Sequence, residues 1–124
     1  MDRPVLLLVD DDPLFRDSIV KLIRRLRPDV SIVTAGNGES AIDVISHHSI
    51  SAVLSDVEMP NGDGFVVAKA AISWMPRRAD RIMLWSGSVD DFKRAKAAEI
   101  GVEIAEKDTA ILPALLARLL PVAT

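Results

Sequence analysis

Short apolar runs alternate with longer amphipathic segments along the whole chain, and this alternation restricts the fold more than any other feature. Short apolar runs bounded by loop residues are typical of buried strands, and apolar residues at helical spacing indicate helices. The predicted strands are Val5–Val9, Val30–Thr34, Ala52–Asp56, Arg81–Trp85 and Val102–Ala105. The predicted helices are Pro13–Leu26, Glu39–His48, Phe65–Trp74, Asp90–Ile100 and Thr109–Leu120. Strict alternation favours an α/β fold, with helices on both faces of a doubly wound parallel sheet.

Residues at the predicted helix ends support these boundaries. Asp12 can cap the first helix, and Pro13 suits its first turn. Asp63 is expected to cap the third helix, and Thr109 is a candidate cap for the last one. The last helix carries an apolar stripe made by Leu112, Leu115, Leu116 and Leu119. We expect this stripe to face the core, and a homodimer interface is the alternative.

Length and composition limit the classes of protein that this chain can belong to. The 124 residues fit a single domain spanning 1–124. A net charge of −3 gives no reason to expect nucleic-acid binding, which needs clustered positive charge. The lack of cysteine excludes disulfides and thiolate chemistry. Neither a signal peptide nor a stretch long enough to span a membrane is visible, so we expect a cytoplasmic protein.

Carboxylates follow two of the predicted strands at the point where each strand ends. Asp10 and Asp11 come directly after the first strand, and Asp56 ends the third. In a parallel sheet these ends meet at one edge, where open α/β folds bind their ligands. Three converging carboxylates repel one another unless a cation lies between them. The sequence therefore predicts a Mg²⁺ site with one carboxylate free to react.

The two remaining strands that lead to this edge add a hydroxyl and a cation. Ser86 follows the fourth strand, and Lys107 follows the fifth. Phosphoryl transfer onto a protein needs a nucleophile, a hard divalent cation, a hydrogen-bond donor and a positive charge for the phosphoryl oxygens. Asp56, the acidic pair, Ser86 and Lys107 supply one candidate for each role.

These residues also form a pattern that resembles a known family. The segment from Asp56 to Gly64 matches Asp-x-x-Met-Pro-x-x-Asp-Gly, and Leu6–Asp12 resembles the first strand and acidic pair of that family. Together with Ser86 and Lys107, this makes the chain similar to response-regulator receiver domains of two-component signalling, including the chemotaxis-regulator type. The resemblance covers essentially the whole chain and implies a flavodoxin-like fold with strand order 2-1-3-4-5.

The resemblance implies a role for each residue of the acidic site. Asp56 would be the phosphoacceptor, and its donor would be a sensor histidine kinase or a histidine phosphotransfer protein. Asp11 would bind Mg²⁺ directly and Asp10 through water, and the backbone carbonyl of Glu58 would be a further ligand. Mg²⁺ is the cofactor that this set implies.

The resemblance also implies how the signal leaves the site. Lys107 would pair with Asp56 at rest and with the phosphoryl group afterwards, while Ser86 would move toward that group and switch a protein-interaction surface. The domain would catalyse its own phosphorylation and slow autodephosphorylation, without turnover of a separate substrate. Glu58 and Ser88 are expected to tune the lifetime of the phosphorylated state.

Two positions depart from the family pattern. Ile104 lies where the family usually has Tyr or Phe, so it cannot report the switch through a moving ring. Asp108 replaces the usual proline after the lysine, and a cis bond is not expected there because a non-proline cis bond costs about 3 kcal/mol. These departures leave the phosphorylation chemistry intact, but they do not fit the family's usual output mechanism and output face. Trp85, next to Ser86, is a candidate fluorescent reporter.

Two other functions compete with this interpretation. A degenerate receiver would act only as a protein-binding module, which the departures at Ile104 and Asp108 favour and the complete acidic site disfavours. A small aspartyl phosphatase is suggested by Asp56-Val57-Glu58, which loosely resembles an Asp-x-Asp motif, although the chain is short for such an enzyme and the second acid is Glu. Because no DNA-binding helix pair follows Leu120, the domain either stands alone with a separate output protein or comes from a chain with a fused effector.

Two groups of basic residues allow both an ordinary and a functional interpretation. Arg24, Arg25 and Arg27 are expected to form a solvated helix end, with a kinase-docking surface as the alternative. His47 and His48 are expected to be a solvated helix end as well, because the sequence shows no second cluster of metal ligands beside them.

Overall fold

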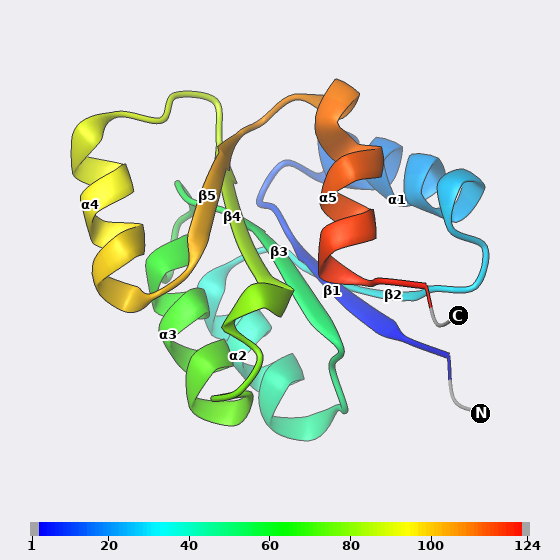
Figure 1. Cartoon of the computed structure of the whole chain (residues 1–124), viewed down its shortest axis with the longest axis horizontal. Helices are drawn as coiled ribbons and strands as arrows, with labels where there is room; N and C mark the ends of the chain where they lie inside the picture. The colour runs from blue at the N-terminus through cyan, green and yellow to red at the C-terminus, as the bar shows by residue number, and fades with distance from the viewer. Residues whose placement is uncertain (1–2, 123–124) are drawn as a thin grey trace.

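A central parallel sheet with helices on both faces organises the computed structural model, which describes residues 3–122 (Figure 1). The strands are β1 (Val5–Val9), β2 (Ser31–Ala35), β3 (Ala52–Asp56), β4 (Ile82–Ser86) and β5 (Glu103–Glu106). They pair in the order β2-β1-β3-β4-β5, and every pair is parallel. The predicted fold class and strand order are therefore confirmed. β2, β4 and β5 each begin and end one residue later than the sequence indicated.

Two layers of helices enclose this sheet. The helices are α1 (Pro13–Leu26), α2 (Gly38–His47), α3 (Gly64–Trp74), α4 (Asp91–Ile100) and α5 (Leu112–Leu119), with short 3-10 helices η1 (Ala79–Arg81) and η2 (Thr109–Ile111). Figure 1 shows α1 and α5 on one face of the sheet and α2, α3 and α4 on the other. The hydrophobic core is divided in the same way, because successive strand residues point to opposite faces. In β1, Leu6 and Leu8 pack with α1 and α5, whereas Leu7 and Val9 pack with α2, α3 and α4.

Side-chain caps begin most of the helices. The carboxylate of Asp12 accepts hydrogen bonds from the amides of Leu14 and Phe15, and that of Asp63 accepts one from the amide of Val66, as the sequence indicated. The expected cap at Thr109 is wrong, because Thr109 is already the first residue of η2. Asp108 has the extended backbone that a cap requires, and its carboxylate accepts a hydrogen bond from the amide of Ala110.

The arginines at the end of α1 divide into two groups. Arg24 and Arg25 are exposed, as expected, but Arg27 is partly buried and the prediction of a fully solvated end is wrong there. Its guanidinium forms a salt bridge with Asp29 and donates a 2.6 Å hydrogen bond to the carbonyl of Leu120. The last carbonyls of a helix have no donor within that helix, so Arg27 supplies one to the end of α5.

The leucine stripe of α5 faces the sheet. Leu112, Leu115, Leu116 and Leu119 are all buried in the α1–α5 layer of the core, which confirms the core interpretation of the stripe. His47 and His48 are exposed at the end of α2, also as predicted.

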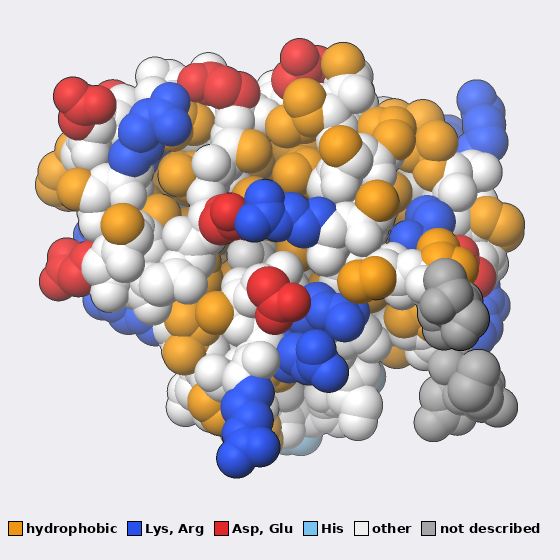
Figure 2. All heavy atoms as spheres, in the orientation of Figure 1, with side chains coloured by type: hydrophobic (Ala, Val, Ile, Leu, Met, Phe, Trp, Pro, Cys, Tyr) orange, Lys and Arg blue, Asp and Glu red, His pale blue; other side chains and the backbone are white. Residues whose placement is uncertain are grey.

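The surface mixes charges of both signs with scattered apolar groups. On the face drawn in Figure 2, Lys and Arg side chains gather over η1 and the end of α3. Arg77 and Arg78 are exposed in this segment, far from the strand ends that carry the aspartates. Between residues 3 and 122, no helix is both long and apolar enough to cross a membrane.

Candidate functional site

The strand register brings the predicted site residues to one edge of the sheet. Val9 of β1 pairs with Ser55 of β3, so Asp10 and Asp56 follow side by side. Asp56 pairs with Trp85 of β4, which places Ser86 one residue further along the same edge. The amide of Lys107 then donates a 2.8 Å hydrogen bond to the carbonyl of Ser86, which fixes the loop after β5 against the end of β4.

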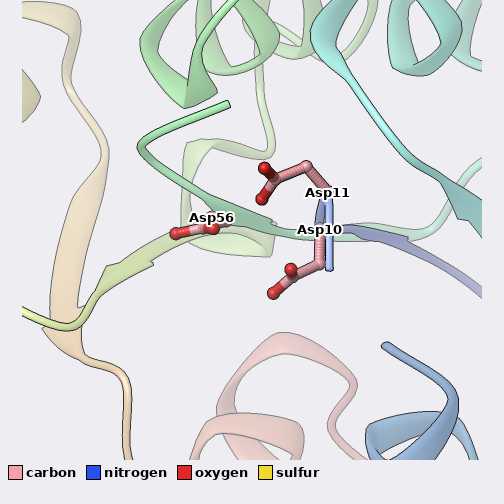
Figure 3. A group of neighbouring side chains, drawn as sticks. All are labelled: Asp10, Asp11 and Asp56. Carbon is pink, nitrogen blue, oxygen red and sulfur yellow. The ribbon is translucent and has the colours of Figure 1, made fainter. Parts of the chain in front are cut away.

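Three carboxylates converge beyond the ends of β1 and β3. Asp10, Asp11 and Asp56 each offer a carboxylate oxygen, and these atoms all lie within 4.8 Å of one another. Figure 3 shows the three side chains directed toward the same space. Asp10 and Asp56 are buried and Asp11 is exposed, so the cluster opens to solvent on the side of Asp11.

Lys107 is the positive charge inside this cluster. Its ammonium lies 2.6 Å from Asp10 Oδ2 and 3.2 Å from Asp56 Oδ2. Burial opposes the charge on the lysine, but the close contact with Asp10 and the charges of Asp10 and Asp56 outweigh it, so the pKa of Lys107 is raised. One ammonium cannot neutralise three carboxylates, and the cluster keeps a negative charge that a divalent cation would balance.

Asp56 is held as an acceptor with its charge only partly compensated. Burial raises the pKa of its carboxyl above the ordinary value, the charge of Asp10 adds to this, and Lys107 opposes it. The amide of Val57 donates to Asp56 Oδ1 at 2.9 Å, while Oδ2 faces Lys107. The Asp56 carboxylate is therefore oriented by the amide of the next residue and by Lys107.

Ser86 belongs to a second set of contacts on the side of α4. Its hydroxyl lies 3.1 Å from Glu58 Oε2 and 3.0 Å from the carbonyl of Ser88. Lys93, on α4, forms a salt bridge with Glu58 and donates hydrogen bonds to Ser86 Oγ at 3.0 Å and to the carbonyl of Ser88 at 2.6 Å. The hydrogen bond from Lys93 is the main reason that the pKa of Glu58 is lowered. We call Ser86, Glu58, Lys93 and Ser88 the Ser86 network.

Close backbone contacts support the loop that carries Glu58. A Cβ atom on Gly64 would lie 2.2 Å from the carbonyl oxygen of Asp56, and the amide of Gly64 donates to the carbonyl of Val57 at 2.8 Å. A Cβ atom on Gly38 would lie 2.3 Å from the carbonyl oxygen of Gly62. Glycine at these positions lets α3 begin directly against Asp56 and lets α2 begin against the loop that precedes α3.

An aromatic pair connects Lys107 with the core. The Lys107 ammonium lies 4.4 Å from the centre of the Phe15 ring, and this ring lies 5.9 Å from that of Trp85. Trp85 is fully buried and directly precedes Ser86. Changes at Lys107 or Ser86 therefore occur next to a buried indole.

The donor set fits Mg²⁺. Hard divalent cations prefer carboxylate oxygens, backbone carbonyls and water, and the cluster offers the first of these from three side chains. The buried oxygen Asp10 Oδ2 accepts no well-formed hydrogen bond and has only the ionic contact with Lys107. The cluster therefore has the charge and the carboxylate oxygens that a divalent cation requires.

The structure joins some of the predicted site residues and separates others. Asp10, Asp11, Asp56 and Lys107 form one cluster, as predicted. Ser86 lies beside it but contacts Glu58 and Lys93 instead of Asp56. Sequence reasoning missed Lys93, and its position in the first turn of the predicted fourth helix, facing the loop after Ser86, was the only available signal.

The two departures from the family pattern have clear places in the fold. Ile104, in β5, is partly buried and packs against the core layer formed with α2, α3 and α4. Asp108 caps η2, and the peptide bond between Lys107 and Asp108 is trans. The Ile104 side chain therefore contributes to the core, and the effect of Ile104 on the switch stays a prediction.

Comparison with known proteins agrees with this arrangement. A family model described as the response regulator receiver domain matches residues 6–107. The chain belongs to this family. It is thereby placed in two-component signalling, and the acidic cluster of this receiver domain is its candidate Mg²⁺ site.

Several relatives resemble this receiver domain over part or most of its length. An uncharacterized response regulatory protein of Vibrio cholerae is 41% identical over 63 residues, which cover 50% of this chain and 24% of the relative. A protein-glutamate methylesterase/protein-glutamine glutaminase of Nitrosospira multiformis is 29% identical over 110 residues, which cover 88% of this chain and 28% of the relative. The chain thus spans only about a quarter of the length of these two proteins.

A solved structure shares the fold. The response regulator protein TrrA of Thermotoga maritima, in complex with Mg²⁺-BeF, superposes with a TM-score of 0.79 at 24% identity, covering 94% of this chain and 99% of that chain.

Proposed function

We propose that this receiver domain accepts a phosphoryl group on Asp56 in a Mg²⁺-dependent reaction and thereby switches a protein-interaction surface. The observation that carries this proposal is the position of Asp56 Oδ2 inside the acidic cluster, 3.2 Å from the ammonium of Lys107. The family membership supports the same chemistry.

The reaction would be a substitution at phosphorus. A carboxylate oxygen of Asp56 forms the new P–O bond while the bond between phosphorus and an imidazole nitrogen of the donor breaks, and that nitrogen keeps the electron pair and is protonated. Lys107 is placed to hold a phosphoryl oxygen, because its ammonium already contacts the Asp56 carboxylate.

The acidic residues would hold the cation. Asp11 and Asp56 are proposed as direct ligands, with the backbone carbonyl of Glu58, and Asp10 as a ligand through water. Bound Mg²⁺ would neutralise charge on the transferring phosphoryl group. Without it, the cluster would repel an anionic donor.

The proposed partners follow from this chemistry. A phosphohistidine donor, either a sensor histidine kinase or a histidine phosphotransfer protein, would supply the phosphoryl group. A separate output protein or a fused effector would respond to the switch. Slow hydrolysis of the acyl phosphate by the domain itself would end the signal.

Intact-mass spectrometry after incubation with acetyl phosphate tests the proposal. Wild type should gain one phosphoryl group only when Mg²⁺ is present, and Asp56→Asn should gain none. Asp17→Asn, an exposed aspartate of α1, is the matched control and should behave as wild type. Phosphoryl uptake by Asp56→Asn at the rate of wild type would show that another residue is the phosphoacceptor.

The same experiment tests one of the two rival functions, and a phosphomonoester assay tests the other. A degenerate receiver that only binds a partner would gain no phosphoryl group under any of these conditions. A phosphatase would turn over a generic phosphomonoester, but the Glu58 carboxylate is bound to Lys93 and Ser86 instead of being free to act as an acid. The geometry therefore favours the phosphoacceptor.

A further inference from the structure

Every hydrogen-bonding position of the Ser86 hydroxyl is occupied in this structure. A serine hydroxyl has one proton to donate and two lone pairs that accept. The oxygen accepts from Lys93 Nζ at 3.0 Å and from the amide of Ser88 at 3.3 Å, and its proton is shared between Glu58 and the carbonyl of Ser88. The hydroxyl can therefore donate to a new acceptor only if it leaves an existing one.

Lys93 is equally saturated. An ammonium has three N–H donors, and Lys93 Nζ has three acceptors around it: the Glu58 carboxylate, Ser86 Oγ and the carbonyl of Ser88. The same ammonium thus connects the loop after β3, the end of β4 and the first turn of α4. Although Glu58 is largely exposed, the Lys93 side chain is only 16% exposed, so the contact is sheltered on the lysine side.

We propose that Lys93 is a positioning residue that holds Ser86 in its resting arrangement, through its salt bridge with Glu58, and that this network competes with the phosphoryl group for the Ser86 hydroxyl. The inference rests on the proposed function, since it concerns the response of Ser86 to a group on Asp56. In this proposal α4 restrains Ser86 directly through Lys93, so the restraint does not need an aromatic residue at position 104.

The network opposes phosphorylation because the two arrangements exclude each other. The hydroxyl has one proton, so donation to a phosphoryl oxygen ends its donation to Glu58. The bond from Lys93 Nζ to Ser86 Oγ further restrains the oxygen on the α4 side. Removing Lys93 should release Ser86 and shift the unphosphorylated population toward the arrangement that binds a phosphoryl group.

The test measures the affinity for BeF₃⁻ at saturating Mg²⁺ by isothermal titration calorimetry. Lys93→Met should bind BeF₃⁻ about three- to tenfold more tightly than wild type, the range expected when one partly exposed ion pair and one hydrogen bond are lost. Glu58→Gln, which keeps the backbone carbonyl proposed to bind Mg²⁺, should shift the affinity in the same direction.

Two further variants separate the effect of the Ser86 network from that of a lost positive charge and from a general loss of structure. Arg94→Met removes the same charge from the neighbouring, exposed position of α4 and should leave the affinity within about twofold of wild type. In a Ser86→Ala background, Lys93→Met should have no effect beyond about twofold, because the hydroxyl that the network holds is gone. A merely structural role of Lys93 would act equally in both backgrounds.

A measurement without Mg²⁺ reports on the resting network directly. The amide of Ser88, which donates to Ser86 Oγ, should exchange its hydrogen faster in Lys93→Met than in Arg94→Met. Equal exchange in the two variants would contradict a restraint by Lys93.

The outcomes distinguish this inference from the proposed function. If wild type failed to bind BeF₃⁻, or if Asp56→Asn bound it as tightly as wild type does, the phosphoacceptor function itself would be wrong. If wild type bound BeF₃⁻ but Lys93→Met bound it equally or more weakly, the function would stand and the resting restraint would be wrong. Tighter binding that persisted in the Ser86→Ala background would also overturn it.

Discussion

The ammonium of Lys107 lies 2.6 Å from Asp10 Oδ2, closer than its 3.2 Å distance from the carboxylate of Asp56. Asp10 is therefore its principal partner at rest, and Asp56 shares the ammonium without being fully neutralised. A phosphoryl group on Asp56 would bring oxygen acceptors within reach of the same lysine. Lys107 could then move from one acceptor to the other without leaving the cluster.

The ionised Asp56 should lower the stability of the unphosphorylated domain at neutral pH. Burial raises the pKa of this carboxyl above 3.8, so the folded protein binds a proton there more tightly than the unfolded chain does. The contribution of this group to stability therefore falls as the pH rises through the window between 3.8 and the raised pKa. At pH 7 without Mg²⁺, Asp56→Asn should therefore unfold at a higher temperature than wild type, and its free energy of unfolding should be larger by about 0.5–2 kcal/mol.

Calorimetric melts of both proteins without Mg²⁺, over about pH 3.5–8, check this expectation, because this range includes the titration of the carboxyl group. The gain in Asp56→Asn should shrink as the pH falls toward the ordinary carboxyl range. The control Asp17→Asn should melt as wild type does. A variant that is less stable than wild type at pH 7 would show that the ion pair with Lys107 outweighs the cost of burial.

Mg²⁺ should stabilise the domain. Substitutions at the adjacent aspartates Asp11 and Asp12 should distinguish the effect of metal binding from that of helix capping. At ten times its dissociation constant a ligand adds about 1.4 kcal/mol to the unfolding free energy. Asp11→Asn should keep the stability of the metal-free protein, because Asp11 is exposed, but should lose most of the response to Mg²⁺. Asp12→Ala should lose about 0.5–2 kcal/mol, because Asp12 caps α1, and keep the response.

Chemical unfolding with and without Mg²⁺ measures both effects. A full Mg²⁺ response in Asp11→Asn would remove that residue from the proposed ligands. A lost response in Asp12→Ala would mean that the cap and the metal site are coupled through the shared loop, in which the amide of Asp12 donates to Asp10 Oδ1.

The sequence was sufficient for the parts of this molecule that depend on local pattern and parallel topology. Strand ends could be located to within one residue from apolar runs, and parallel order brings residues such as Asp10 and Asp56 to one edge. The contact between Lys93 and Glu58 could not be found in this way, because it depends on how the first turn of α4 lies over the loop after β3. Arg27 was misjudged for the same reason, since its acceptor belongs to the far end of the chain.

Gly64 should be required for the position of Asp56. A Cβ atom there would overlap the carbonyl oxygen of Asp56 at 2.2 Å, and the neighbouring backbone has no flexible end that could yield. Gly64→Ala should therefore lose about 1–3 kcal/mol of stability and slow phosphoryl uptake. Gly87→Ala is the matched control, because its Cβ atom would meet nothing within 4 Å.

Urea unfolding and the acetyl phosphate assay check both variants together. Gly87→Ala should stay within about 0.5 kcal/mol of wild type. If Gly64→Ala were as stable as Gly87→Ala, the start of α3 would have to shift more easily than its hydrogen bond to Val57 indicates.

Trp85 should report the change at Ser86 by fluorescence. The chain has two tryptophans, and Trp74 is 59% exposed whereas Trp85 is fully buried. In a Trp74→Phe background the remaining indole packs on Phe15, whose ring also lies against Lys107. BeF₃⁻ with Mg²⁺ should therefore change the emission intensity, while the emission maximum stays that of a buried indole.

The change should be reversed by removing Mg²⁺ with a chelator and absent in Asp56→Asn. An emission that did not respond, in a protein shown by calorimetry to bind BeF₃⁻, would mean that Ser86 and Lys107 rearrange without moving the aromatic pair.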